Sequence, residues 1–88
     1  MKIHTLKIER QYYDKVIRGI KKAELRKNDR DFKVNDLLIF VDTNGELIDS
    51  CLPTMFRITD VCEYKDALKE DYVMLSIDNC NDYNPTRY

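Results

Sequence analysis

Long apolar runs are missing from this sequence, and the longest one is Leu37–Val41. A helix that spans a bilayer needs roughly 20 predominantly apolar residues, so no transmembrane helix and no membrane partner is expected. The first ten residues, MKIHTLKIER, also lack the apolar stretch of a secretory signal peptide. We therefore expect a cytoplasmic protein that stays where it is made.

Cysteine is scarce, and its three positions are Cys51, Cys62 and Cys80. An odd number cannot pair completely within one chain, and spacings of eleven and eighteen residues match no metal-ligand pair. We expect reduced, partly buried thiols in place of a catalytic cysteine, and neither a metal nor another cofactor.

Net charge is nearly absent, since the formal value is −1, but the charges are distributed unevenly. Residues 1–36 hold eleven Lys/Arg and six Asp/Glu, a net of +5, whereas residues 37–88 hold four and ten, a net of −6. A protein with this balance has no bulk attraction for nucleic acid. Any contact with phosphate is expected on one side only.

Local periodicity predicts one helix and five strands. In residues 9–19, Tyr12, Tyr13, Val16 and Ile17 recur at helical spacing, and Gly19 stands where a left-handed C-terminal cap would form. Alternating or continuous apolar residues predict strands at residues 2–8, 22–28, 37–41, 52–64 and 72–77.

This order, β-α-β-β-β-β, predicts an α+β, mainly β fold. One helix cannot cover both faces of a short five-stranded sheet, whereas about five mostly antiparallel strands that close into a small barrel would remove the sheet edges. The main helix, which follows the first strand, would plug an end or side. With 88 residues there is room for one core, so we expect a single domain over residues 1–78 and a polar C-terminal tail over residues 79–88.

The most charged stretch covers residues 21–36 and includes the expected short strand at 22–28. Alternation would direct Ala23 and Leu25 into the core and place Glu24 and Arg26 on the other face, about 7 Å apart. Lys21 precedes them at the mouth of the strand. These three side chains can line a site for a polar ligand. The alternative is a solvated strand face whose Glu–Arg pair contributes about a few tenths of a kcal/mol.

Each of the three groups has a chemical role to offer such a ligand. The guanidinium of Arg26 can grip a phosphate or carboxylate at two points. The carboxylate of Glu24 can accept a hydrogen bond from an amino group or transfer a proton. Lys21 can hold negative charge or, if desolvated, act as a base or nucleophile.

The segment GIKKAELR, Gly19 to Arg26, fits the pattern G-x-K-x-x-E-x-R. It resembles the signature of the ASCH domain, a small β-barrel of the PUA-like group. The wider frame, with IHTLKI before it, ELRKNDRDFKVNDLLIF overlapping it and DYVMLSI near the end, is similar to short, mostly uncharacterised ASCH and PUA-like proteins of bacterial and phage genomes. The resemblance covers about residues 2–78.

The resemblance implies a PUA-like barrel with a cleft beside the helix, lined by the motif. Domains of this kind are associated with RNA and modified nucleotides, either as binding modules or as ribonucleases, and one group hydrolyses the amide of N4-acetylcytidine. In that group a lysine, a threonine and a glutamate act; Lys21 matches the lysine, and Glu63 and Glu70 are candidates for the glutamate. Glu24 replaces the threonine, and a carboxylate that pairs with Lys21 prepares it poorly as a base.

We therefore expect an RNA- or nucleotide-binding module that uses the motif cleft and an adjacent basic face. The residues expected to contact the ligand are Lys21, Lys22, Glu24, Arg26, Lys27, Arg30, Lys33 and His4. For His4 the alternative is a strand-end histidine with a satisfied hydrogen bond. Of Tyr12 and Tyr13, one is expected in the core. For the other, core or half-exposed packing is expected, and the alternative is a stacking surface for a base.

Two other functions stay open at the level of sequence. The first is a small hydrolase of a modified nucleoside amide or of RNA, with Lys21 and Glu24 as its catalytic acid/base pair. The second is a protein-interaction accessory whose acidic half, residues 37–88, docks a basic partner.

Overall fold

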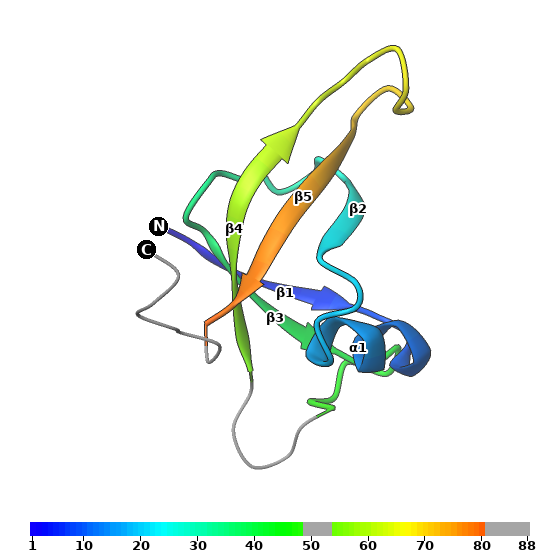
Figure 1. Ribbon diagram of the computed structural model, residues 1–88, viewed down its shortest axis with the longest axis vertical. Coiled ribbons are helices and arrows are strands. Elements are labelled where there is room, and N and C mark those ends of the chain that lie inside the picture. Colours follow the sequence, from blue (N-terminus) through cyan, green and yellow to red (C-terminus); the bar gives the residue numbers. More distant parts are fainter. Residues whose placement is uncertain (49–53, 81–88) are drawn as a thin grey trace.

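The computed structural model describes residues 1–48 and 54–80, and in these residues it contains five strands and one helix (Figure 1). Their bounds are β1 Ile3–Lys7, α1 Arg10–Ile17, β2 Ala23–Lys27, β3 Leu37–Val41, β4 Met55–Cys62 and β5 Tyr72–Asn79. The predicted order of elements is confirmed. The predicted start of the fourth strand at residue 52 and the tail from residue 81 onward lie outside the described residues.

The strands form one sheet in the order β1-β3-β4-β5-β2. Only the β1–β3 pair is parallel, so the sheet is mostly antiparallel as predicted. The sheet curls into a half-barrel (Figure 1). The expectation of a closed barrel is wrong, because in the described part of the chain β1 and β2 are sheet edges that do not pair with each other. Arginine side chains, described below, occupy the free edge of β1 where a further strand pairing would have closed the barrel.

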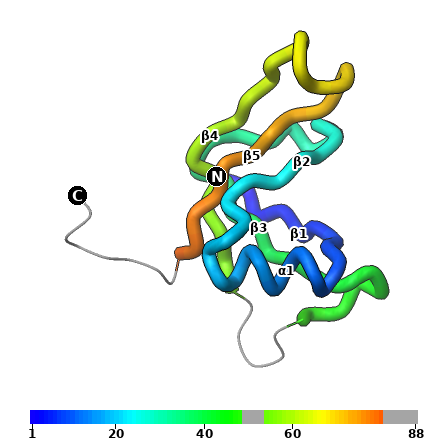
Figure 2. Tube along the Cα trace, turned by 45° about the vertical axis from the view of Figure 1, so that its right-hand side comes forward, coloured from blue at the N-terminus to red at the C-terminus, as the bar shows by residue number. Residues whose placement is uncertain are grey.

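The core fills the concave side of the half-barrel. Alternate residues of β1, β3, β4 and β5 point inward, and Tyr13 and Val16 of α1 pack against them. The main core side chains are Leu6, Ile8, Leu38, Phe40, Phe56, Ile58, Val73, Leu75 and Ile77. The eight-residue α1 lies near one end of the curled sheet, beside β1 and β3 (Figure 2). No helix in the described residues has the length and apolar character needed to cross a membrane.

The turn that leads from α1 to β2 depends on Gly19, whose φ is +74°. A side chain is strained in this left-handed region, whereas glycine enters it without a Cβ penalty. The N–H of Gly19 donates to the Val16 carbonyl (3.1 Å), and the N–H of Ile20 donates to the Lys15 carbonyl (2.9 Å). The predicted glycine cap is thus confirmed, and it directs Lys21 toward the start of β2.

The orientation of β2 differs from the prediction. Leu25 is 58% exposed and Glu24 is buried, so the expectation that Leu25 fills the core is wrong. In the β2–β5 register, Glu24 lies opposite Leu75, whereas Leu25 lies opposite the exposed Met74. Because β2 is an edge strand, its inner face borders the opening of the half-barrel, where charged side chains can find partners without entering the apolar centre.

Candidate functional site

A cleft of about 440 Å³ lies between the two free edges of the sheet. One wall comes from the end of β1 and the beginning of α1, and the other comes from β2 and the residues before it. The lining residues are Lys7, Ile8, Glu9, Tyr12, Lys21, Ala23, Glu24, Leu25, Arg26 and Met74. The cleft therefore exists because the sheet remains open between β1 and β2.

Glu24 is the centre of the charged wall, and it is only 7% exposed. Its Oε1 accepts from the Nζ of Lys21 at 2.5 Å, and its Oε2 accepts from the Nη2 and Nε of Arg26 at 2.8 Å and 3.2 Å. Two cations thus surround one carboxylate, which leaves this group of three with a formal charge of +1. The structure brings together the three motif side chains that the sequence placed on one short element.

A second set of contacts joins β2 and its following loop to the free edge of β1. The Nη2 of Arg26 donates to the carbonyl of Lys7 at 2.5 Å, and the Nη1 of Arg30 donates to the carbonyl of Thr5 at 2.6 Å. We call these two contacts the arginine bridge. They supply β1 carbonyls with hydrogen bonds that a paired strand would otherwise provide.

Lys21 is held by more than its carboxylate. Its Nζ also donates to the carbonyl of Ala23 at 2.5 Å, and its side chain is 28% exposed. In the described contacts Lys21 therefore uses two of the three donors that an ammonium group carries, and Arg26 uses its Nε and Nη2 but not its Nη1. The remaining donors can bind an anion without first dismantling the group.

The two helix tyrosines have different positions. Tyr13 is buried, and its ring lies edge-on to Phe40 with centroids 6.4 Å apart. Tyr12 is exposed and lines the cleft. An exposed aromatic ring beside cationic groups offers a base a surface for stacking.

The other predicted cations do not gather at the cleft. Lys22 is exposed just before β2, and Lys27 lies on the strand face opposite to that of Glu24. The Nζ of Lys33 lies 3.4 Å from the carboxylate of Asp31, and both side chains are well exposed. The predicted basic face is therefore divided, and Arg30 joins the cleft group only through the arginine bridge.

His4 is in the core and does not line the cleft. It is buried, its Nε2 lies 2.8 Å from Oδ2 of Asp36, and its ring packs edge-on against Phe32 at 4.7 Å. This environment fits the alternative of a strand histidine with a satisfied hydrogen bond. The position does not suit a histidine that acts at the rim of the cleft.

Asp36, the partner of His4, is 3% exposed. Its carboxylate accepts from the backbone N–H groups of Lys2 (3.0 Å) and Lys33 (3.1 Å) as well as from His4. Burial raises the pKa of Asp36, but the hydrogen bond with His4 and the two backbone donors favour the ionised form, and the net effect lowers the pKa. Asp36 is thus a structural carboxylate that ties together three segments of the chain.

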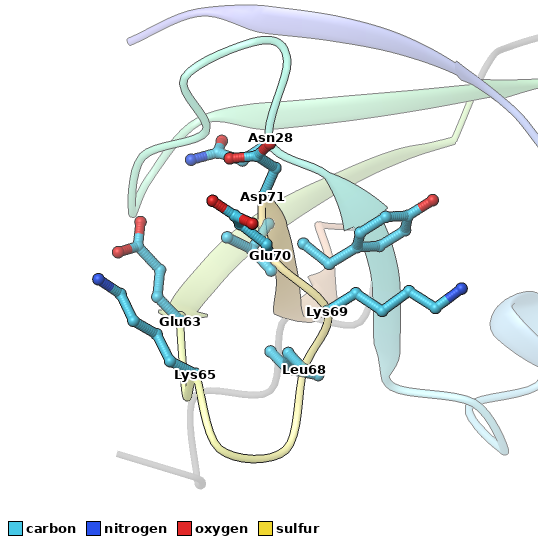
Figure 3. Close-up of a pocket in the computed structure, with 9 residues that line it drawn as sticks. Asn28, Glu63, Lys65, Leu68, Lys69, Glu70 and Asp71 are labelled. Carbon is cyan, nitrogen blue, oxygen red and sulfur yellow. The ribbon is translucent and has the colours of Figure 1, made fainter.

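A second hollow, of about 430 Å³, lies at the connection between β4 and β5 (Figure 3). Glu63 and Glu70 line it, together with Lys65 and Lys69, and Figure 3 shows Glu63 beside Lys65. In Figure 1 this connection lies at the end of the molecule opposite α1. Neither candidate glutamate therefore lines the cleft of Lys21.

Sequence reasoning missed two charged residues of the cleft, Lys7 and Glu9. Both are exposed and stand where β1 passes into α1. Alternation placed Lys7 on the polar side of the first strand, but nothing local indicates that this strand is an edge. The missing signal was the long-range pairing that leaves β1 and β2 facing each other.

The described residues contain no cluster of three or more His, Cys, Asp or Glu side chains suited to a metal ion. Cys62 and Cys80 are free thiols, of which Cys62 is half-buried and Cys80 exposed. Cys51 lies outside the described residues.

Residues 3–77 match a protein family described as a domain of unknown function, DUF3850. The chain is also 39% identical, over 79 residues, to a protein of Escherichia phage P2 described as an uncharacterized 12.9 kDa protein in the GpA 3′ region. That alignment covers 84% of this chain and 66% of the phage protein. The chain therefore spans slightly less than two thirds of the length of this relative.

Proposed function

We propose, from the premise that the chain belongs to the DUF3850 family, that the cleft between β1 and β2 is a binding site for RNA or a nucleotide. We further propose that the half-barrel is a variant of the PUA-like fold, as the motif in residues 19–26 suggests. The observation that carries the function is the convergence of Lys21, Glu24 and Arg26 on one cleft that Tyr12 also lines.

A nucleotide supplies a group for each part of this cleft. Its phosphate binds the free donors of Arg26 and Lys21, which a guanidinium and an ammonium offer in different geometries. Its base stacks on Tyr12, as bases do on exposed aromatic rings. A volume of about 440 Å³ is within the range of small-ligand sites.

Glu24 makes this site selective because it competes with the incoming anion. The carboxylate already occupies one side of Lys21 and of Arg26, so a weakly charged or neutral ligand gains little by approaching them. A ligand that also donates a hydrogen bond to Glu24 is favoured over one that does not. Affinity is therefore expected to be modest and to fall steeply with added salt.

The test is a titration of the protein with short RNAs and free nucleotides at low ionic strength. Arg26→Ala is expected to weaken binding about tenfold, since a hydrogen bond to a charged group contributes about 1.5–3 kcal/mol. Lys69→Ala, which removes a cation in the distant hollow, is the matched control and is expected to leave binding unchanged. Undetectable binding of every ligand, or equal binding by wild type and Arg26→Ala, would contradict the proposal.

The second candidate is a small hydrolase of a modified nucleoside amide, such as N4-acetylcytidine, or of RNA. The observation in its favour is that Lys21 Nζ and Glu24 Oε1, the two proposed catalytic groups, are in hydrogen-bond contact on the wall of the cleft. Incubation with N4-acetylcytidine and with mixed RNA tests it. Absence of product, or equal product from Lys21→Ala, eliminates this candidate.

A further inference from the structure

The arginine bridge places two guanidinium groups along one strand edge. Arg30 is bound to the carbonyl of Thr5, and Arg26 is bound to the carbonyl of Lys7. These carbonyls belong to alternate residues of β1, so they lie about 7 Å apart along the strand. Successive phosphates of an extended single-stranded nucleic acid follow each other at a similar interval.

Anchoring by carbonyls keeps these guanidinium groups available to a ligand. A carbonyl is neutral, so it fixes the position of the side chain without cancelling its charge, and a side chain that is already fixed loses less entropy on binding. In the described contacts Arg30 uses only its Nη1, out of the five donors that a guanidinium carries.

Neighbouring carboxylates reduce the charge of the two arginines unequally. Glu24 binds Arg26 directly, but Lys21 binds the same carboxylate. Near Arg30, Asp31 is paired with Lys33 at 3.4 Å, while the exposed Asp29 offsets part of the charge. The edge of β1 therefore still presents two positive groups.

We propose that Arg26 and Arg30 form a track for two successive phosphates, so that the ligand is a single-stranded polynucleotide and not a free nucleotide. This inference rests on the proposed function, because Arg26 belongs to the cleft. One phosphate binds at the cleft beside Tyr12, and the next binds at Arg30. A mononucleotide engages only the first position.

The experiment compares ligands that differ in the number of phosphates. Pools of the four nucleoside 5′-monophosphates, of 5′-phosphorylated dinucleotides and of 5′-phosphorylated tetranucleotides are titrated at several salt concentrations. The dinucleotides are expected to bind about tenfold more tightly than the monophosphates, with a salt slope steeper by about 0.7 for the added phosphate. DNA pools are measured beside RNA pools, and tighter binding of the RNA pools would identify RNA as the preferred polynucleotide.

The decisive variant is Arg30→Ala, and the quantity measured is the ratio of dinucleotide to mononucleotide affinity. This ratio is expected to fall about tenfold, and the extra salt slope is expected to disappear. Arg30→Lys keeps the positive charge but loses the two-pronged hydrogen bonding of the guanidinium. It is therefore expected to keep the extra salt slope and to lower the ratio of dinucleotide to mononucleotide affinity about threefold. Lys65→Ala is the control, and thermal unfolding of each variant verifies that the fold is retained.

Two results would overturn the track while leaving the proposed function intact. One is equal affinity of wild type for mononucleotides and dinucleotides. The other is an unchanged ratio in Arg30→Ala. If no pool binds at all, the proposed function itself fails, and that outcome is distinct from both.

Discussion

Two buried carboxylates of the half-barrel, Asp36 and Glu24, are satisfied in different ways. Asp36 is 3% exposed and Glu24 is 7% exposed, so both depend on partners within the protein. Asp36 accepts two backbone N–H groups and the ring of His4. Within the described residues, Glu24 accepts from the ends of two long side chains, which are 28% and 25% exposed.

This difference separates a structural carboxylate from an exchangeable one. Backbone donors cannot leave Asp36 without moving the chain that carries them, so the carboxylate fixes the path of the segments around it. The donors to Glu24 belong instead to the ends of long side chains, so they place no such constraint on the backbone of the segments around it. Burial alone therefore does not distinguish the two carboxylates, whereas the kind of donor that each one accepts from does.

The largest expected effect comes from Asp36→Asn. The amide would direct a donor at one of the N–H groups that the carboxylate now accepts, and it would leave His4 with a poorer partner. Breaking a buried hydrogen-bonded pair on one side costs about 3–5 kcal/mol, and we expect a loss of about 3 kcal/mol in the free energy of unfolding, measured in urea.

The matched control is Asp66→Asn, on the exposed connection between β4 and β5. It is expected to change the free energy of unfolding by less than about 0.5 kcal/mol. A loss of similar size in both variants would mean that Asp36 has no special role.

Acid is expected to remove the contribution of Asp36 progressively. Because its pKa is lowered in the folded protein, the unfolded chain binds the proton more readily, and stability falls as the pH falls through roughly 4 and below. Above that range the contribution is complete. Wild type and Asp36→Asn should therefore differ most near neutral pH and converge toward pH 2–3, which urea unfolding at several pH values measures.

Some acid sensitivity should persist in Asp36→Asn because of Asp42. The backbone N–H of Glu46 is the main cause that lowers the pKa of Asp42; burial opposes it, and the N–H of Asn44 and Arg10 add to it. If the difference in stability between wild type and Asp36→Asn instead widens on acidification, the conclusion that folding lowers the pKa of Asp36 is contradicted.

Glu24→Gln is expected to lower the stability less than Asp36→Asn does, and to strengthen the binding of anions. Lys21 and Arg26 can reach solvent, so the loss should be about 1 kcal/mol. Removal of the competing carboxylate should strengthen binding of inorganic phosphate severalfold, measured by calorimetry at low salt. Weaker phosphate binding in Glu24→Gln would show that this carboxylate does not compete for the two cations.

The smallest effect is expected at Leu25, next to Glu24 on the opposite face of β2. Leu25→Thr should change the free energy of unfolding by less than about 0.5 kcal/mol, because the side chain is already exposed. Leu75→Ala, at a fully buried position on β5, should cost about 2–5 kcal/mol. Similar losses at both positions would contradict the described orientation of β2, and with it the burial of Glu24.

Most of the fold could be predicted because its signals are local. The alternation in residues 3–7, the helical spacing of Tyr13 and Val16, and the need for glycine at residue 19 each act within a few residues. The inner face of β2 could not be predicted in this way, since alternation separates two faces without saying which one meets the core. The open edge between β1 and β2 could not be predicted either, because it depends on pairing between strands that are distant in the sequence.

The site was predictable to the extent that it is contiguous in sequence. The spacing of Lys21, Glu24 and Arg26 placed three groups on one element, and the structure brings them together. Lys7, whose carbonyl accepts from Arg26, lies nineteen residues earlier on another strand, which no local pattern indicates. His4 was ambiguous because its partner, Asp36, lies 32 residues away.

The arginine bridge has a consequence for neighbouring molecules. The exposed rim of a sheet is a template on which a strand of another chain can dock, and such docking is a common beginning of aggregation. Arg26 and Arg30 occupy the β1 carbonyls that an incoming strand would need, and they add positive charge that repels a second copy of the same rim. Docking of a further strand on the β1 edge should therefore be disfavoured as long as both guanidinium groups are in place.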